Sequence, residues 1–137
     1  MPLASTDGAV AVDRSLSFGP AINAAVCVSA ATSPSVPGLL GPGGTDGSGG
    51  WHAGLPWAGC AILGASAAEL AELRAKAIAD QMVVADMAAA GQATRVYDLY
   101  IDAVAHTDER DLTLVAVSVV GPRNRVAKLV HRLDLLQ

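Results

Sequence analysis

The sequence predicts a single α/β domain in three layers, with a mixed sheet of about four strands sandwiched between helices. Strand-like apolar runs alternate along the chain with helix-like segments, and this order is typical of α/β layer folds. The chain has 137 residues, which is the usual size of one domain, and 52% of them are hydrophobic. Residues 1–137 are therefore expected to build one core of their own.

The first half of the chain is expected to contain two strands and one helix. The apolar run at residues 8–13 predicts the first strand. Gly19 and Pro20 predict the N-cap and first position of a helix that continues to about Thr32, because the missing N–H of proline costs nothing there. Residues 34–50 contain seven glycines and are predicted to form a loop. The second strand is expected at residues 57–63.

The second half alternates in the same way. Ser66 and Glu69 have the spacing of a capping box and predict a helix that ends near Asp80. A short strand is expected at 82–85, a helix at 91–106 and a helix at 123–132. Residues 112–120 are nearly all apolar and β-branched, which predicts a central strand buried on both faces. Residues 134–137 are either a tail or a short edge strand.

Composition narrows the classes of function. The net charge is −4, which disfavours a nucleic-acid partner because such proteins usually carry a basic excess. The last predicted helix is basic, and we expect it to be a solvated face rather than an RNA contact. No apolar run reaches the ~18 residues of a membrane span, and the N-terminus lacks the features of a secretion signal. We therefore expect a cytoplasmic protein that does not enter a membrane.

The two cysteines and the high hydropathy give two further expectations. Cys27 and Cys60 lie in apolar segments and are expected to be buried free thiols, with no disulfide and no metal site. No cofactor is expected. The mean hydropathy is +0.41, which is high for a soluble chain. The surplus of apolar residues would cover both faces of a sheet or a subunit interface, so a homodimer is expected.

Four short motifs connect the sequence with a known family. They are Asn23-Ala24-Ala25, His52-x-Gly54, Tyr97-Asp98 and Gly121-Pro122-Arg123. The order and spacing of these motifs resemble those of a family of uncharacterised bacterial proteins known as domain-of-unknown-function family 2000. The opening strand, turn and helix, and the closing strand at 114–122, are similar to those of type II peptidyl-tRNA hydrolases. The resemblance implies a peptidyl-tRNA hydrolase II-like fold.

The first helix departs from the hydrolase pattern at the residues that carry the hydrolase chemistry. In those enzymes the helix reads Gly-Lys-x-Ala-Ala-Gln, with a histidine three residues after the glutamine. The corresponding positions here are Ile22, Val26 and Ser29. Two apolar side chains and a short hydroxyl cannot replace a cation, an amide and an imidazole. Peptidyl-tRNA hydrolysis itself is therefore not expected.

Asn23 and His52 are the first two candidate site residues. Asn23 is polar on an otherwise apolar helix and could hold a carboxylate, a phosphate or a carbonyl oxygen, or it could make a local capping bond. His52 follows the Gly-rich loop and could act as an acid or base near neutral pH, or it could tie the loop to the sheet.

Tyr97 and Asp98 are the other two candidates. Both lie early in a predicted helix, where a carboxylate gains from the helix dipole. Tyr97 also lies on the apolar stripe of that helix, so it could be a core residue with its hydroxyl bonded to a partner. If these two converge with Asn23 and His52, they form a small polar binding site.

Two functions follow from these residues. The first is the binding of a small molecule or peptide in a pocket at the N-terminus of the first helix. The alternative is a hydrolase acting on an ester or amide, with His52 as the acid or base and Asn23 as the donor to an oxyanion or carbonyl.

Overall fold

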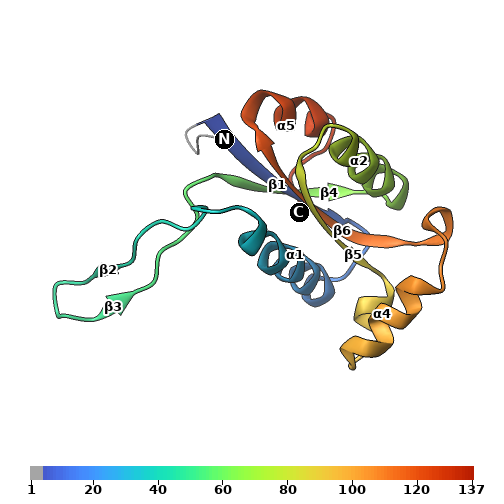
Figure 1. Ribbon diagram of the computed structural model, residues 1–137, viewed down its shortest axis with the longest axis horizontal. Helices are drawn as coiled ribbons and strands as arrows, with labels where there is room; N and C mark the ends of the chain where they lie inside the picture. The colour runs from blue at the N-terminus through green and yellow to red at the C-terminus, as the bar shows by residue number, and fades with distance from the viewer. Residues whose placement is uncertain (1–4) are drawn as a thin grey trace.

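The computed structural model describes residues 5–137 and has a four-stranded mixed sheet at its centre (Figure 1). The strand order is β4-β1-β6-β5. β1 (Thr6–Asp13) runs parallel to β4 (Cys60–Ala65) and antiparallel to β6 (Leu114–Pro122), which also pairs antiparallel with β5 (Val83–Ala88). The predicted mixed α/β fold with four strands is confirmed.

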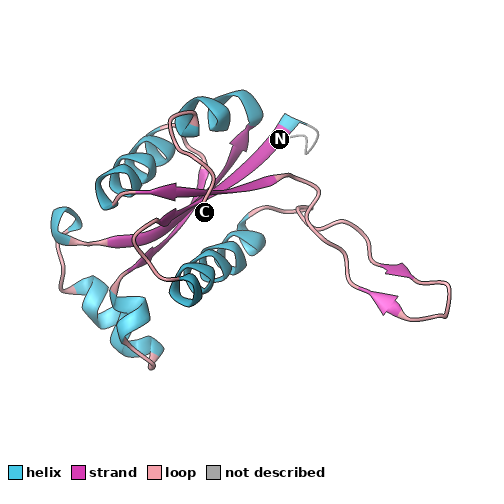
Figure 2. Cartoon of the chain, turned by 180° about the vertical axis from the view of Figure 1, so that it is seen from behind, coloured by secondary structure: helices cyan, strands magenta, loops and turns pink. Residues whose placement is uncertain are grey.

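Helices cover both faces of this sheet. α1 (Phe18–Thr32) packs on one face, against β1, β5 and β6. α2 (Ala67–Ala79) and α5 (Arg123–Val130) pack side by side on the other face, as Figures 1 and 2 show. α3 (Ala90–Ala93) and α4 (Tyr97–Ala105) follow β5 at the edge of the sheet. Short 3₁₀ turns lie at Ser33–Ser35 and Glu109–Asp111.

Successive side chains of β1 point to opposite faces of the sheet and so belong to two separate apolar cores. Val10 and Val12 pack with α1, whereas Ala9 and Ala11 belong to the cluster under α2 and α5. β6 lies between β1 and β5 and is almost wholly buried, as predicted. Each face of the sheet therefore has its own apolar layer, which is why the central strand carries so few polar residues.

β6 nevertheless contains a buried hydroxyl, which is that of Ser118. It forms a 2.8 Å hydrogen bond with the hydroxyl of Thr32 at the end of α1, and Thr32 in turn donates to the carbonyl of Val28. Because both hydroxyls have a partner, their burial carries no large desolvation cost. The pair fixes the C-terminal end of α1 on the sheet.

The predicted capping box at the start of α2 is confirmed. The Ser66 hydroxyl accepts the N–H of Glu69 at 3.1 Å, and the Glu69 carboxylate accepts the N–H of Ser66 at 2.9 Å. Arg14 donates to the same carboxylate at 2.9 Å. These donors, the Ser66 N–H first and Arg14 second, hold the pKa of Glu69 below its ordinary value.

Replacing Ser66 by alanine is expected to lower the free energy of unfolding by about 1 kcal/mol, because the substitution removes an N-cap acceptor. Urea denaturation followed by circular dichroism measures this loss. Ser48→Ala, on an exposed turn, is the matched control and should shift the unfolding midpoint far less. Equal effects of the two substitutions would show that the cap contributes nothing.

Two predicted helix boundaries are wrong. α1 begins at Phe18 with Ser17 as its N-cap, two residues earlier than the predicted cap at Gly19. The helix predicted for 91–106 is two helices, α3 and α4. Thr94 is extended between them, with φ of −117° and ψ of 143°, and its hydroxyl donates to the carbonyl of Ala90 at 2.9 Å. A β-branched residue that caps its own preceding turn ends the helix there.

Of the residues predicted as a loop at 34–50, residues 40–50 form one side and the tip of a hairpin. Residues 40–57, which we call the arm, pair through β2 (Gly44–Thr45) and β3 (Trp51–His52) and through a bridge between Leu40 and Pro56. Figures 1 and 2 show the arm projecting away from the sheet and its helices. Its base is anchored because Val36 and Leu39 are buried against Val120 of β6.

Glycines allow the two sides of the arm to approach each other. A Cβ atom at Gly43 would collide with the indole of Trp51, and a Cβ at Gly54 would overlap the carbonyl oxygen of Gly41. Gly49 has a φ of +89° in the turn at the tip. The glycines that predicted an irregular loop instead make a closely paired hairpin.

The C-terminal residues extend the sheet. Leu135 forms an antiparallel bridge with Leu63 of β4, the Leu136 N–H donates to the carbonyl of Ile62, and the Gly64 N–H donates to the carbonyl of Asp134. Of the two predictions for this segment, the short edge strand is the one that fits.

Candidate functional site

The four predicted site residues do not form one pocket. His52 lies on the arm, whereas Tyr97 and Asp98 begin α4, and Figure 1 places the arm and α4 at opposite ends of the molecule. Asn23 lies on α1 between them and is exposed. The expected convergence is therefore not found, because a hairpin carries His52 away from the body of the domain.

The contacts of His52 fit a structural role at the tip of the arm. Its Nε2 lies 2.8 Å from Oδ2 of Asp46, and both side chains are exposed. The other carboxylate oxygen of Asp46 accepts the N–H groups of Ser48 and Gly50. The bond from His52 is the main cause that lowers the pKa of Asp46, followed by the N–H groups of Gly50 and Ser48. His52 thus stabilises the turn that the hydrogen bonds to Asp46 hold together.

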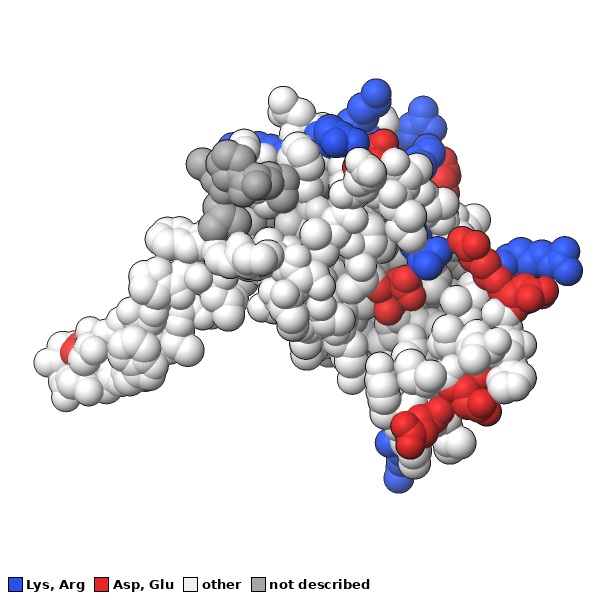
Figure 3. Space-filling model, viewed as in Figure 1, with Lys and Arg blue, Asp and Glu red and all other residues white. Residues whose placement is uncertain are grey.

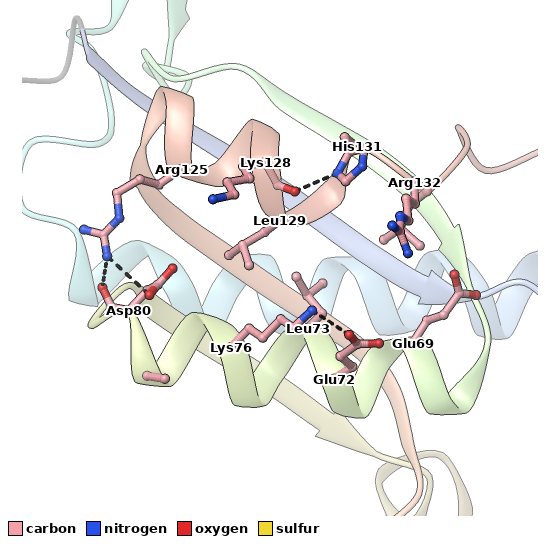
Figure 4. Close-up of a pocket in the computed structure, with 12 residues that line it drawn as sticks. Glu69, Glu72, Leu73, Lys76, Asp80, Arg125, Lys128, Leu129, His131 and Arg132 are labelled. Atoms are coloured by element: carbon pink, nitrogen blue, oxygen red, sulfur yellow. Dashed lines mark hydrogen bonds and ion pairs between the residues drawn. The ribbon is translucent and has the colours of Figure 1, made fainter.

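A hollow of about 870 Å³ lies between α2 and α5, and Figure 4 shows charged side chains facing one another across it. Lys76 pairs with Glu72 at 2.6 Å, and Arg125 binds both the carboxylate and the backbone carbonyl of Asp80. Lys128 and Arg132 border the same hollow. Because its charges of both signs largely compensate each other at the surface, this groove fits the expected solvated face of the last helix better than a ligand site.

A smaller cavity of about 330 Å³ lies between α1 and the α3–α4 segment, beside the β5 edge of the sheet. One wall comes from Cys27, Val28 and Ala31 of α1, and Met87 of β5 contributes to the lining. The opposite wall comes from residues around the break between α3 and α4, which are Gly91, Thr94, Arg95, Val96, Tyr97 and Tyr100. The lining is mostly apolar, with the polar groups at a few points. Of the four predicted site residues, only Tyr97 lines this cavity.

Specific hydrogen bonds hold the walls of this cavity in place. The Gln92 amide donates to the carbonyl of Pro20 at 2.7 Å, which ties α3 to α1. The hydroxyl of Tyr100 accepts the N–H of Ala88 at 3.3 Å, which ties α4 to the end of β5. The rings of Tyr97 and Tyr100 lie 6.0 Å apart and are tilted by 49°. The cavity is therefore preformed by contacts between three elements.

The two charged residues that line the cavity differ in their partners. Asp86 accepts a 2.8 Å hydrogen bond from Arg74, which also reaches Glu109 at 3.0 Å. Asp86 and, to a lesser extent, Glu109 raise the pKa of Arg74 against the effect of burial. Arg95, in contrast, is exposed and forms no ion pair with the residues that the structure describes. The cavity thus has one cation that is available to a ligand.

Both cysteines are free, as predicted, but neither is buried. Cys27 lies on the flank of α1 that lines the cavity. Cys60 begins the edge strand β4, where partial burial, and then the charge of Asp7, raise the pKa of its thiol. The prediction of burial is wrong because the apolar segments that contain the cysteines lie at the surface of the domain.

A comparison with protein-family models matches residues 8–137 to a family described as a protein of unknown function (DUF2000). The chain belongs to the DUF2000 family. The family predicted from the four sequence motifs is therefore confirmed, and the match includes every strand of the sheet apart from the first two residues of β1.

Among solved structures, the DUF2000 chain is similar to a protein of unknown function, Atu0240, from Agrobacterium tumefaciens strain C58. The TM-score is 0.88 at 14% sequence identity, and the match covers 96% of this chain and 97% of the other. At this identity the likeness shows a shared fold. None of the curated proteins matches the sequence.

Two further kinds of feature are absent from the described residues, 5–137. No three or more histidine, cysteine, aspartate or glutamate side chains within that range are grouped to hold a metal ion. Within the same residues, no helix is both long enough and apolar enough to cross a bilayer.

Sequence reasoning missed Cys27, Arg95 and Tyr100 as cavity residues. Tyr100 is three residues after Tyr97 and so lies on the same face of α4. The helix predicted for 91–106 includes Arg95 near its start, and that prediction does not place its side chain at a cavity. The pair of β-branched residues on either side of it, Thr94 and Val96, was the available signal for a break that places Arg95 at the cavity.

Proposed function

We propose that this DUF2000 protein binds a small molecule or short peptide with an apolar body and a carboxylate, in the cavity between α1 and the α3–α4 segment. The observation that carries the proposal is the 330 Å³ cavity itself, whose lining is mostly apolar and includes the unpaired cation Arg95. This volume lies at the small end of the range of known ligand sites, about 300–1,000 Å³.

The apolar lining determines which kind of group the main part of the ligand can be. Val28 and Met87 are buried at the cavity, and two tyrosine rings stand opposite them. Such a lining favours a flat or branched apolar group, since burial of apolar area is the main source of affinity. An extended polar ligand such as a sugar would leave its hydroxyl groups without partners.

Arg95 determines which polar group the ligand is expected to carry. A guanidinium presents a planar fork of N–H donors that matches a carboxylate in two parallel hydrogen bonds. Because Arg95 is exposed, its attraction is screened by salt and adds selectivity more than affinity. The proposed pocket borders the C-terminal half of α1, at Cys27 and Ala31, and not the N-terminus of the helix as predicted.

The hydrolase alternative stays a prediction, as does the likeness to peptidyl-tRNA hydrolases. Neither His52 nor Asn23, the predicted acid or base and its companion donor, lines the proposed pocket. Binding alone is the function that the cavity supports.

Thermal-shift measurements with apolar carboxylates and their matching amides test the proposal. Phenylacetate, indole-acetate and dipeptides with an apolar C-terminal residue should raise the unfolding temperature more than the corresponding amides. Arg95→Gln should remove the preference for the acid, with an affinity loss of about tenfold for one charged hydrogen-bonding partner. Arg110→Gln is the matched control, since Arg110 is exposed and does not line the cavity.

A second variant separates the cavity from the charge. Ala31→Phe should fill the cavity and abolish stabilisation by acids and amides alike. In a Cys60→Ser background, a bound ligand should also slow the modification of Cys27 by a thiol reagent. Stabilisation that persists in Ala31→Phe, or a failure of every apolar acid to stabilise the protein, would overturn the proposal.

A further inference from the structure

We propose that two copies of this chain form a symmetrical dimer in which the arm of each copy packs on α1 of the other. The surface of α1 that would receive the arm is the α1 stripe, defined as Phe18, Ile22 and Val26. This inference is independent of the proposed ligand site. It is drawn from the distribution of charge, the exposed apolar side chains and the surface area of the chain.

The arm and α1 belong to a long segment that is almost without charge. Between Arg14 and Glu69, the only lysine, arginine, aspartate or glutamate is Asp46 at the tip of the arm. About a quarter of residues are charged in an ordinary soluble domain. Figure 3 shows the result on one face, where the arm is white apart from a small red patch near its end and most charged side chains gather on the other parts of the molecule. Depletion of charge is typical of the core of a protein interface.

The arm carries large apolar side chains that its own body does not cover. Trp51 is 70% exposed and Leu55 is 79% exposed, and Trp57 and Leu40 are also exposed. Tryptophan is among the residues most enriched in the centres of interfaces. The arm projects away from the sheet and helices (Figures 1 and 2), and these side chains are exposed in the single chain.

The α1 stripe is the matching surface on the body. Phe18, Ile22 and Val26 are spaced by four residues, so they lie along one flank of the helix, and Phe18 is 82% exposed. α1 contains no charged residue. Cys27 and Ala31 lie on a different flank, which borders the ligand cavity. A partner on the stripe would therefore leave that cavity open.

The exposed area of the chain is large enough for such an interface. A compact monomer of 13.8 kDa is expected to expose about 6,600 Å². This chain exposes 8519 Å². The excess of roughly 1,900 Å² is more than twice the ~800 Å² that each partner buries in a standard interface. A second copy that covers the arm and the stripe would return the surface to the usual range.

A second copy is the occupant that fits because it carries both complementary parts. In a twofold dimer the same patch is used by both partners, so an arm–stripe contact occurs twice. A chain with both an uncovered apolar arm and an uncovered apolar stripe is suited to this exchange. A different partner would have to supply two unrelated surfaces.

Sedimentation equilibrium and tryptophan fluorescence of the full chain test the dimer. We expect twice the chain mass at micromolar concentration. The only two tryptophans of the sequence, Trp51 and Trp57, both lie on the arm, so their emission reports whether the arm is covered. Dilution should produce the monomer and a red shift of the emission together. A monomer at all concentrations, or dissociation without a red shift, would overturn the proposal.

Two sets of variants locate the contact. Trp51→Ser with Leu55→Ser changes the arm, and Ile22→Lys with Val26→Lys changes the stripe. Each should be monomeric with an unchanged far-ultraviolet spectrum. Leu99→Ser with Ile101→Ser, on exposed positions of α4, is the matched control and should stay dimeric. A dimer that survives the first two variants, or is broken only by the α4 variant, contradicts the assignment.

Mixing the two monomeric variants gives the sharpest test. A heterodimer of the arm variant and the stripe variant retains one intact arm on one intact stripe. The mixture should therefore form dimers, whereas either variant alone should not. If no mixed dimer forms, the arm of one copy does not bind the stripe of the other. Binding of the wild-type chain to neutral lipid vesicles in place of self-association would assign the same surface to a membrane and would also overturn the proposal.

Discussion

Leu70→Ala is expected to lower the free energy of unfolding by about 3 kcal/mol, which is the middle of the range for leucine truncation in a packed core. Leu70 lies on α2, is 0% exposed, and belongs to the core cluster that includes Leu63 and Val117 of the sheet. The substitution removes apolar contacts and leaves a cavity between the helix and the sheet, and neighbouring backbones cannot close it. Urea denaturation followed by circular dichroism measures the loss.

Leu99→Ala is the matched control for this substitution. Leu99 is 56% exposed on α4, so its truncation should change stability by no more than about 0.5 kcal/mol. Similar destabilisation by the two substitutions would mean that the face between α2 and the sheet is not the main core.

Gly54→Ala is expected to disrupt the arm while the body stays folded. The new Cβ would overlap the carbonyl oxygen of Gly41, and this is a clash with backbone that no rotation of a side chain relieves. The hydrogen bond from the Gly41 N–H to the carbonyl of Leu55, 2.8 Å in the native arm, should be lost. Limited proteolysis should then cleave residues 40–57 at least tenfold faster, since local opening controls cleavage.

Gly47→Ala separates this clash from a general effect of added side chains in the arm. A Cβ at Gly47 would meet no atom within 4 Å, so this variant should be cleaved at the native rate. At concentrations low enough for the chain to be monomeric, the urea midpoint of the body should be the same for both variants. Resistance of Gly54→Ala to cleavage would show that the two sides of the arm do not lie as closely as the structure places them.

The sheet and its main helices were predictable because their signals are local. The capping box of Ser66 and Glu69 fixes the start of α2 through two hydrogen bonds within four residues. The apolar run at 112–120 predicts a strand in the centre of a sheet whose two faces are covered by helices. β6 is that strand. The break at Thr94 depends on the weaker conformational preference of a β-branched residue. The prediction of a continuous helix over 91–106 missed it.

The candidate site was less predictable because it depends on distances between segments. Nothing near His52 in the sequence indicates that glycines would build a projecting hairpin and carry it away from α4. Tyr97 was found because it lies on a periodic stripe, whereas Arg95 reaches the cavity only because a helix ends beside it. Glycine-rich composition predicts that a segment is irregular, but it does not distinguish a loop from a closely packed pair of strands.

The order of strands in the sheet also determines when the domain can fold. Gly8 of β1 pairs on one side with Cys60 and on the other with Val120, near the end of the chain. β1 is therefore synthesised long before β6, and its hydrogen-bond ladder is complete only when β6 is available. Contacts of such long sequence separation slow folding. We expect α2, whose cap is local, to form early, and the sheet to close only after synthesis of residues 114–122.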